Sequence, residues 1–299
     1  MAEENNNTAL LRQVCFLSCR NRFDEARKVI YKAAKISDDE AGKVSYDNLR
    51  ALVSARTANK KIHQMLDVEQ AMFDTYQALH KRTIHDEPTV AEAESCIYRI
   101  EKILPHLSKD EKIYAKYQQS LCCAYTKDSD ERRYQFLNEV IKGVKKGKPR
   151  SDERYYNCAV VIFGLDIPSK EKYEALKSAR KKTSAESPFL QHYDDMMPKV
   201  AEKYYDTLMV QIKSTSDYAQ IRPLYETAIV VADDLPFEEE RKNANKLYLY
   251  GSLTNLQRQY HDMDGYDDNC RRQQSLIYKQ ARLKKRNGTY DYPAFDRFA

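Results

Sequence analysis

The stretch NRFDEARKVIYKAAK, residues 21–35, decides the fold class of this chain. Its apolar residues recur near the 3.6-residue spacing that gives an α-helix one apolar face. The segment before it has the same spacing, at Leu10, Leu11, Val14, Phe16 and Leu17. A polar break separates the two segments, so we predict that the chain opens with a hairpin of two helices.

The next segment, SDDEAGKVSYDNLRALVSARTANKKIHQML (37–66), opens with Ser37 and three acidic residues. A serine side chain accepts hydrogen bonds from the free N–H groups at a helix start, and acidic side chains suit the positive end of the helix dipole. No strong helix breaker follows. We therefore predict that this segment runs into one long third helix.

Further helices are predicted by the same periodicity over most of the remaining chain. They are expected at 69–82, 89–106, 109–126, 131–146, 151–165, 169–185, 188–213, 217–233, 238–262 and 270–286. Prolines or charged turns separate most of them, and short connections make consecutive helices antiparallel. The fold class that we predict is all-α, an antiparallel array of helical hairpins. No strict 34-residue repeat occurs, and tryptophan is absent, so the array is irregular.

The composition favours helices and gives little material for an enzyme. Of the 299 residues, 42% are hydrophobic and 32% are charged, a balance typical of many thin amphipathic helices. Only seven glycines are present, and no glycine-rich phosphate loop, zinc-protease motif or serine-hydrolase motif occurs. We expect no catalytic residues, no metal site and no cofactor.

The cysteines and the N-terminus indicate a reducing compartment. Seven cysteines are an odd number without CxxC spacing, which is typical of reduced thiols in a helical core. The start MAEENNNTALL lacks a basic and apolar leader, and no run of 18 apolar residues follows. The expected localisation is cytoplasmic, without a membrane partner.

Two basic blocks, KGVKKGKPR (142–150) and KQARLKKR (279–286), carry much of the net charge of +5. We interpret them as solvated loops and helix ends, and keep a nucleic-acid patch as the alternative. The 23 tyrosines are interleaved with lysine and arginine, which suits base stacking, although tyrosine more often packs between helices. Nucleic acid is therefore not our expected partner.

Several segments, taken in order, resemble the 14-3-3 family. They are NRFDEA (21–26), SDDEAGKVSYDNLRALVSAR (37–56), EAESCIYRIEKILPHL (92–107), DEKIYAKYQQSL (110–121) and RYYNCAVVIFGLDIPSKEK (154–172). The resemblance covers about residues 8–213, and it suggests a divergent member such as protozoa carry.

The resemblance implies nine antiparallel helices and a groove that binds phosphoserine or phosphothreonine peptides. It divides the chain into a 14-3-3-like domain at 1–213, a helical extension packed on it at 214–268, and a basic C-terminal segment at 269–299. It also implies a homodimer formed through residues 8–82, with Arg22, Asp24 and Glu25 available for ion pairs between subunits.

The basic residues of the family's groove carry over in part. Arg50 falls at the position of the groove lysine, but the position seven residues later is Thr57, and the nearest arginine is Arg56. Lys116 falls at the position of a peptide-contacting lysine on the family's fifth helix.

Other groove positions have changed or are ambiguous. The family's arginine–tyrosine pair becomes Cys123 and Ala124, which removes two charge-assisted or polar contacts to phosphate. The family's backbone-clamping asparagine and groove valine correspond to Asn157 and Val160. Asn255 is a further candidate if the ninth family helix is 238–262 rather than 188–213.

The stretch RRQQSLIY (271–278) has the arginine spacing that basophilic kinases recognise before a serine, which makes Ser275 a phosphorylation candidate. It follows a polar segment, YHDMDGYDDN (260–269), that we interpret as a flexible linker. Phosphorylated Ser275 would then reach the protein's own groove, or the groove of a neighbouring subunit, as a tethered ligand. The alternative is that 270–286 is a basic terminal helix packed on the body.

The expected function is a phosphopeptide-binding adaptor of the 14-3-3 type that regulates phosphorylated client proteins. The alternative is an irregular helical scaffold that binds protein or RNA without phosphate recognition. Binding that requires phosphorylation of a peptide distinguishes the first function, and steeply salt-dependent polynucleotide binding supports the second.

Overall fold

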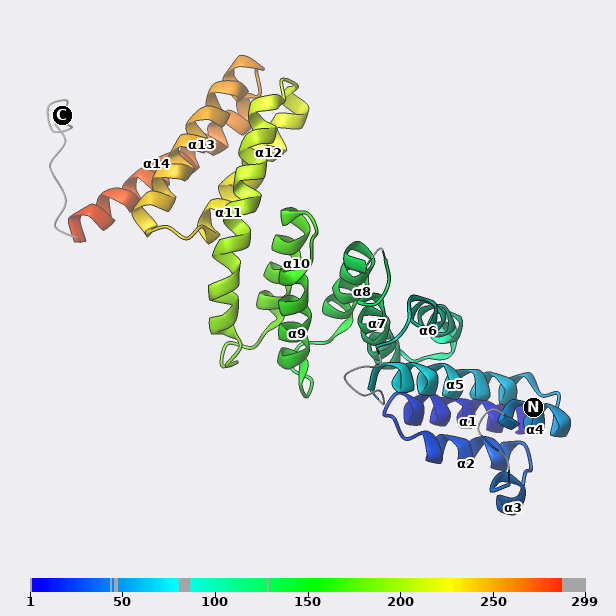
Figure 1. Ribbon diagram of the computed structural model, residues 1–299. Helices are drawn as coiled ribbons and strands as arrows, with labels where there is room; N and C mark the ends of the chain where they lie inside the picture. The colour runs from blue at the N-terminus through cyan, green and yellow to red at the C-terminus, as the bar shows by residue number, and fades with distance from the viewer. Residues whose placement is uncertain (1, 44, 46–47, 81–86, 128, 287–299) are drawn as a thin grey trace, which may run out of the picture. The chain divides into compact units, whose positions relative to one another are not determined.

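The computed structural model describes residues 2–43, 45, 48–80, 87–127 and 129–286. Every regular element in these ranges is a helix, and successive helices form antiparallel hairpins, which confirms the predicted all-α array (Figure 1). The first helices are α1 (Ala2–Ser18), α2 (Phe23–Ala33), α3 (Asp38–Ala41), α4 (Leu49–Arg56), α5 (Lys60–His80), α6 (Val90–Ile103) and η2 (Leu104–His106). They are followed by α7 (Lys109–Cys123), α8 (Ser129–Gly143), α9 (Ser151–Gly164), α10 (Ser169–Lys182), α11 (Leu190–Ser214), α12 (Tyr218–Val231), η3 (Ala232–Asp234), α13 (Glu239–Gln259) and α14 (Met263–Arg286).

The chain divides into two compact units by its internal contacts. The first unit is Met1–Ile167 with Ser178–Ser187, and the second is Pro168–Lys177 with Pro188–Ala299. The sequence-based boundaries at 213 and 268 rest on the resemblance, and they stay a prediction beside this division by packing. Residues 287–299, the end of the expected basic segment, lie outside the described residues.

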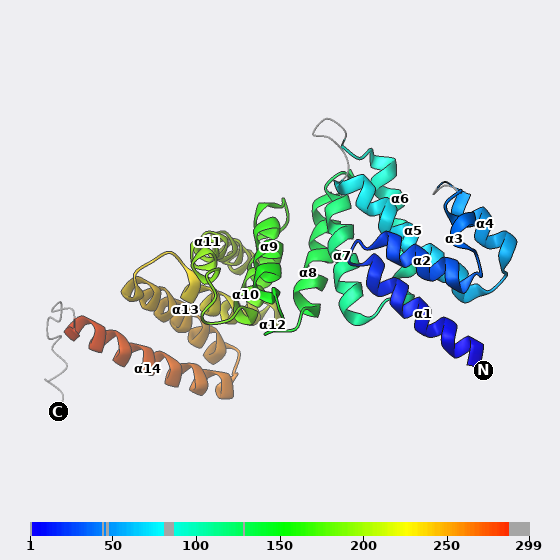
Figure 2. The same cartoon turned by 90° about the horizontal axis from the view of Figure 1, so that it is seen from below.

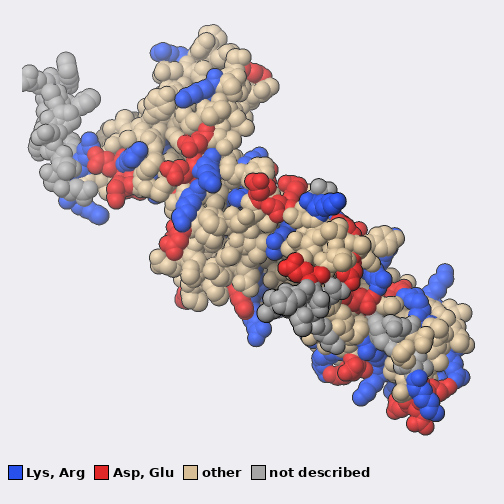
Figure 3. Space-filling view, viewed as in Figure 1, with Lys and Arg blue, Asp and Glu red and all other residues tan. Residues whose placement is uncertain are grey.

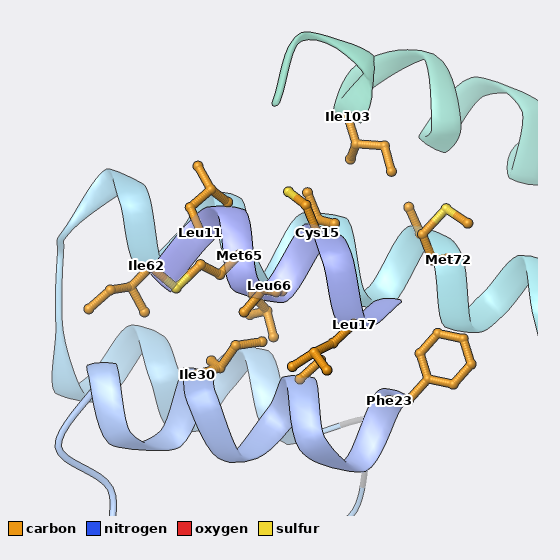
Figure 4. Close-up of a cluster of buried hydrophobic side chains, with 14 of the residues drawn as sticks. Leu11, Cys15, Leu17, Phe23, Ile30, Ile62, Met65, Leu66, Met72 and Ile103 are labelled. Atoms are coloured by element: carbon orange, nitrogen blue, oxygen red, sulfur yellow. The ribbon is translucent and has the colours of Figure 1, made fainter. Parts of the chain in front are cut away.

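The core of the first unit forms where α1 lies against both α2 and α5, and Figures 1 and 2 show the three helices side by side. Val14, Ile30 and Val68 are fully buried there, and Leu66 is nearly so. Figure 4 shows side chains of all three helices pointing toward one another, with Ile103 of α6 above them. Burying one such side chain stabilises the fold by roughly 1.5–3 kcal/mol, so the predicted opening hairpin is confirmed and needs α5 to complete its core.

Capping boxes fix the starts of three helices. In each, a hydroxyl oxygen accepts from a backbone N–H three residues later, and a glutamate accepts from the cap's own N–H. The pairs are Ser37 with Glu40, Thr89 with Glu92, and Ser108 with Glu111. The N-cap predicted at Ser37 is therefore confirmed.

The long third helix predicted from Ser37 onward was wrong. Helix α3 has only four residues, and α4 ends at Arg56 because Thr57 has an extended backbone with φ −155°. The Thr57 hydroxyl accepts from the N–H of Asn59, and the Asn59 side chain accepts from the N–H of Lys61. These local bonds start α5 afresh, because short polar side chains offer the backbone an alternative to the helix ladder.

The flexible linker predicted at 260–269 was also wrong. His261 has a left-handed backbone with φ 57° that turns the chain tightly, and α14 begins at Met263. An Asp262 carboxylate oxygen accepts from the N–H of Gly265, and the other accepts from Tyr218 and Arg222 of α12. Asp262 therefore caps the N-terminus of α14. Helix α14 packs on α13, and its Leu276 is buried.

All seven cysteines lie among the described residues and are free thiols, and only Cys270 is not buried. Burial raises the pKa of the Cys158 thiol to about 12. The prediction that most of the cysteines are unpaired side chains of the helical core is confirmed. In the described part of the chain, no helix has the length and apolarity needed to cross a membrane.

One carboxylate is buried in the first core. Glu69 of α5 is fully buried and accepts from Arg27 Nε at 2.7 Å, while its second oxygen has no partner among the described residues. Burial raises the pKa of Glu69 to about 7, against the lowering effect of Arg27. The native state therefore binds a proton at Glu69 more tightly than the unfolded chain does.

We predict that part of the stability is lost as the pH rises from about 4.5 to about 7, because the fold favours the protonated form of Glu69. The contribution is about 1–3 kcal/mol. Urea unfolding of the wild type and of Glu69→Gln, measured across this range, checks the prediction. The variant should show a flatter dependence on pH, and parallel curves would contradict the assignment.

Two helix-terminal glycines offer a matched test of packing. A Cβ added at Gly143 of α8 would lie 2.9 Å from Cγ1 of Ile113, whereas one added at Gly164 of α9 meets no atom within 4 Å. We expect Gly143→Ala to destabilise the fold by about 1–3 kcal/mol because α7 and α8 must separate. Gly164→Ala should stabilise by up to about 1 kcal/mol. Equal midpoints in urea for the two variants would refute the close approach.

Candidate functional site

A hollow of about 560 Å³ lies between α4, α5, α6 and η2, and we call it the basic hollow. Its lining comprises Arg50, Asp67, Gln70, Ala71, Tyr98, Arg99, Lys102, Ile103 and His106. All of these residues belong to the first compact unit. Figure 3 shows basic and acidic side chains interspersed over the drawn surface. The lining of the basic hollow differs from this mixed pattern, because it has more basic than acidic residues.

Arg50 reaches the hollow because the short helix α4 is held from its other side. Leu49 and Val53 are buried under α4, which leaves Arg50 half-exposed beside α5. Its Nη2 donates to Asp67 Oδ1 at 2.5 Å and to Gln70 Oε1 at 3.2 Å. Nη1 donates to no described residue, so the guanidinium keeps donors for a further acceptor.

Helix α6 and η2 supply the other cations. Arg99 pairs with Asp74 through Nη1, and its side chain is 47% exposed. Lys102 Nζ lies 5.0 Å from the centre of the Tyr98 ring and makes no ion pair with any described residue. The wall of the hollow thus carries three permanent positive charges and the single carboxylate of Asp67, an arrangement that suits an anion.

The predicted basic residues fall in different places. Arg50 lines the basic hollow, whereas Arg56 pairs with Glu40 of α3 outside it. Lys116 of α7 lies 3.4 Å from Glu139 of α8, with Nζ 4.8 Å above the ring of Phe136. It lines neither of the hollows described for this unit.

Cys123 is fully buried and Ala124 forms the C-cap of α7, so neither offers a polar contact to a ligand. Asn157 is exposed on α9, and Val160, one turn later, is 40% exposed. Asn157 lines a second hollow of about 190 Å³ between α7, α8 and α9, which we call the tyrosine hollow. Its lining comprises Ile113, Tyr114, Tyr117, Val140, Arg150, Glu153, Arg154 and Asn157.

Two candidates lie in the second unit. Asn255 is exposed on α13, and Ser275 is exposed in the middle of α14, where RRQQSLIY is helical throughout. Arg272 pairs with Asp268 one turn back. Phosphorylated Ser275 as a self-ligand stays a prediction, and most of the segment that was expected to carry it as a flexible linker is helical.

The basic hollow also holds three residues that we did not predict from the sequence, Arg99, Lys102 and His106. Their spacing of three and four residues places them on one helical face, a pattern that was available in the sequence. The helix break at Thr57, which ends α4 close to the face that carries Arg99 and Lys102, was not predicted from the sequence. Among the described residues, no group of three or more His, Cys, Asp or Glu side chains is placed to hold a metal ion.

Comparison of this chain with protein families, with curated proteins and with solved structures gives no match. Any function therefore has to be argued from the two hollows and the surface around them.

Proposed function

We propose that this protein is a non-enzymatic adaptor of the 14-3-3 type that acts in the cytoplasm and binds phosphoserine or phosphothreonine segments of client proteins. The observation that carries the proposal is the meeting of Arg50, Arg99 and Lys102 around one hollow. A bound phosphoryl group would receive donors from two guanidinium groups and one ammonium group. Tyr98 and Ile103 would form an apolar wall beside the phosphorylated residue.

The charges favour a phosphate over a carboxylate in this place. A phosphoserine carries about −1.5 to −2 charges at neutral pH and three acceptor oxygens, so it competes with the single charge of Asp67 or Asp74 for the arginines. Each charge-assisted hydrogen bond stabilises the complex by about 1.5–3 kcal/mol. An unphosphorylated segment leaves the internal ion pairs in place and gains little.

We predict that Arg50→Glu and Arg99→Glu each weaken binding of a phosphoserine peptide by about 10²-fold or more, because each removes donors and adds repulsion. Fluorescence anisotropy with phosphorylated and unphosphorylated forms of one peptide library measures this. Arg258→Glu, on the exposed end of α13, makes the same charge change and should leave the affinity unchanged. Circular dichroism checks that helicity is retained.

The outcome separates the proposal from its alternative. Equal affinity of the wild type for phosphorylated and unphosphorylated peptides supports a scaffold without phosphate recognition. Lys116→Glu tests the position that the resemblance assigned on α7. Loss of binding in that variant alone would place the peptide on α7 and remove the basic hollow from the site.

We also propose that the chain forms a homodimer through residues 8–82. Phe16 of α1 is 45% exposed and offers apolar surface, whereas Arg22 and Glu25 already pair with each other within one subunit at 2.5 Å. Ion pairs at such exposed positions contribute little, so Phe16 should matter more. Sedimentation should show a dimer at micromolar concentration that Phe16→Glu dissociates and Arg22→Ala does not. A monomeric wild type refutes this.

A further inference from the structure

One edge of the first unit is built from the ends of four helices. Lys182, the last residue of α10, donates from Nζ to the backbone oxygens of Ile141 and Lys142 at 2.6 and 3.0 Å, and so caps the end of α8. The N–H of Ser184 donates to Asp152 in the first turn of α9 at 3.2 Å. Gly143 of α8 approaches Ile113 near the start of α7. The block 142–150 is therefore an exposed connection between α8 and α9 whose two ends are held by hydrogen bonds.

This edge, which we call the lysine edge, carries cations without acidic partners. The five basic residues of the block are exposed, and neither they nor Lys182 form an ion pair with any residue that the structure describes. They are Lys142, Lys145, Lys146, Lys148 and Arg150. In the same unit, Arg50, Arg56 and Arg99 each pair with a carboxylate, whereas the five cations of this block pair with none among the described residues.

Two carboxylates near the edge accept hydrogen bonds from the backbone, and a third, that of Glu153, lines the tyrosine hollow. Glu111 accepts from the N–H of Ser108 at 2.8 Å as part of a capping box, and Asp152 accepts from the N–H of Ser184. The pKa of Lys182 is lowered by burial and then by the charge of Lys109 at the start of α7. Positive potential at the edge is therefore left for a ligand to neutralise.

The tyrosine hollow opens beside these cations, because Arg150 belongs to both the block and the lining. Tyr114 and Tyr117 present ring surface there, and the exposed side chains of Arg154 and Asn157 stand at its α9 side. Tyrosine rings and guanidinium planes stack on nucleobases, and an amide side chain pairs with the polar edge of a base.

We propose that the lysine edge binds a single strand of nucleic acid, with the lysines on successive phosphates and one base in the tyrosine hollow. A phosphopeptide presents one phosphate and does not match a row of cations, and a lipid surface does not reach into a recessed tyrosine pocket. We did not expect nucleic acid from the sequence, because 142–150 was interpreted as a solvated loop and the tyrosines as residues that pack between helices. The edge shares no residue with the basic hollow, so this site stands or falls independently of phosphopeptide binding.

The test uses the full chain with fluorescein-labelled oligouridine RNA and oligothymidine DNA in anisotropy titrations at about 50 and about 200 mM salt. Binding should weaken with salt, with a slope of log K against log salt of about −0.7 for each contacted phosphate. The triple variant Lys145→Glu, Lys146→Glu, Lys148→Glu should bind more than about tenfold more weakly and reduce the slope by about 2. The matched control Lys199→Glu, Lys203→Glu, Lys213→Glu makes the same charge change on exposed residues of α11, outside both basic blocks, and should bind like the wild type.

Inorganic polyphosphate separates base binding from attraction to a polyanion alone. Asn157→Ala should lower the affinity for both oligonucleotides several-fold and leave the affinity for polyphosphate unchanged. If Asn157→Ala lowers the affinity for RNA and DNA equally, the site recognises the base and the phosphate. If the affinity for RNA falls further, the site also contacts the 2′-hydroxyl group. An unchanged affinity of the triple variant for RNA and DNA overturns the lysine edge. Equal effects of Asn157→Ala on oligonucleotide and polyphosphate overturn the base site.

The same set of variants tests phosphopeptide binding at the basic hollow and nucleic-acid binding at the lysine edge independently of each other. The triple variant should bind a phosphoserine peptide as the wild type does, because its substitutions lie outside the basic hollow. Arg50→Glu should bind oligouridine normally for the same reason. Loss of both ligands in either variant would show that the two sites are not distinct, and would overturn the lysine edge as an independent site.

Discussion

The longer helices of this chain each have an apolar stripe that neighbouring helices must cover. Helix α1 illustrates the constraint, because it lies against both α2 and α5 and its Val14 is fully buried. A two-helix hairpin alone would leave part of the stripe in water, where each exposed side chain of this size forfeits roughly 1.5–3 kcal/mol. Stability therefore arises between neighbouring hairpins, and the polar faces and connections remain free to carry binding residues.

The connections decide which polar residues meet. Thr57 and Asn59 interrupt what would otherwise be one helix, and the short helix α4 then places Arg50 across from α5. At the other site, Lys182 closes the end of α8 and keeps the start of the basic block against α10. In both places a few local hydrogen bonds, each contributing about 0.5–1.5 kcal/mol, position charges from separate helices around one hollow.

Most helices could be predicted from the sequence, but only some of the residues that line the basic hollow could. The period of the apolar residues predicted the all-α array and most helix bounds, because burial of a stripe is a property that each helix carries in its own sequence. The long third helix and the flexible linker were predicted wrongly, since Thr57 and Asp262 act through local hydrogen bonds that compete with helical periodicity. Arg50 was found as a candidate, whereas its neighbours Arg99 and Lys102 were not, because their meeting depends on how α4 and α6 pack on α5. The resemblance to a phosphopeptide-binding family supplied a function but not the position of the hollow.

The hairpin of α13 and α14 contains a buried pair of amide side chains, and this pair affects how the two helices align along each other. Asn269 of α14 donates to Gln257 of α13 at 3.0 Å, and both side chains are buried. Sliding α14 by one helical turn would keep much of the apolar contact but separate the two amides in a place that water does not reach. An unpaired buried amide costs about 1–3 kcal/mol, so the two helices have a single favoured register. The amide pair thus selects one alignment of α13 and α14 from several that apolar packing alone would permit.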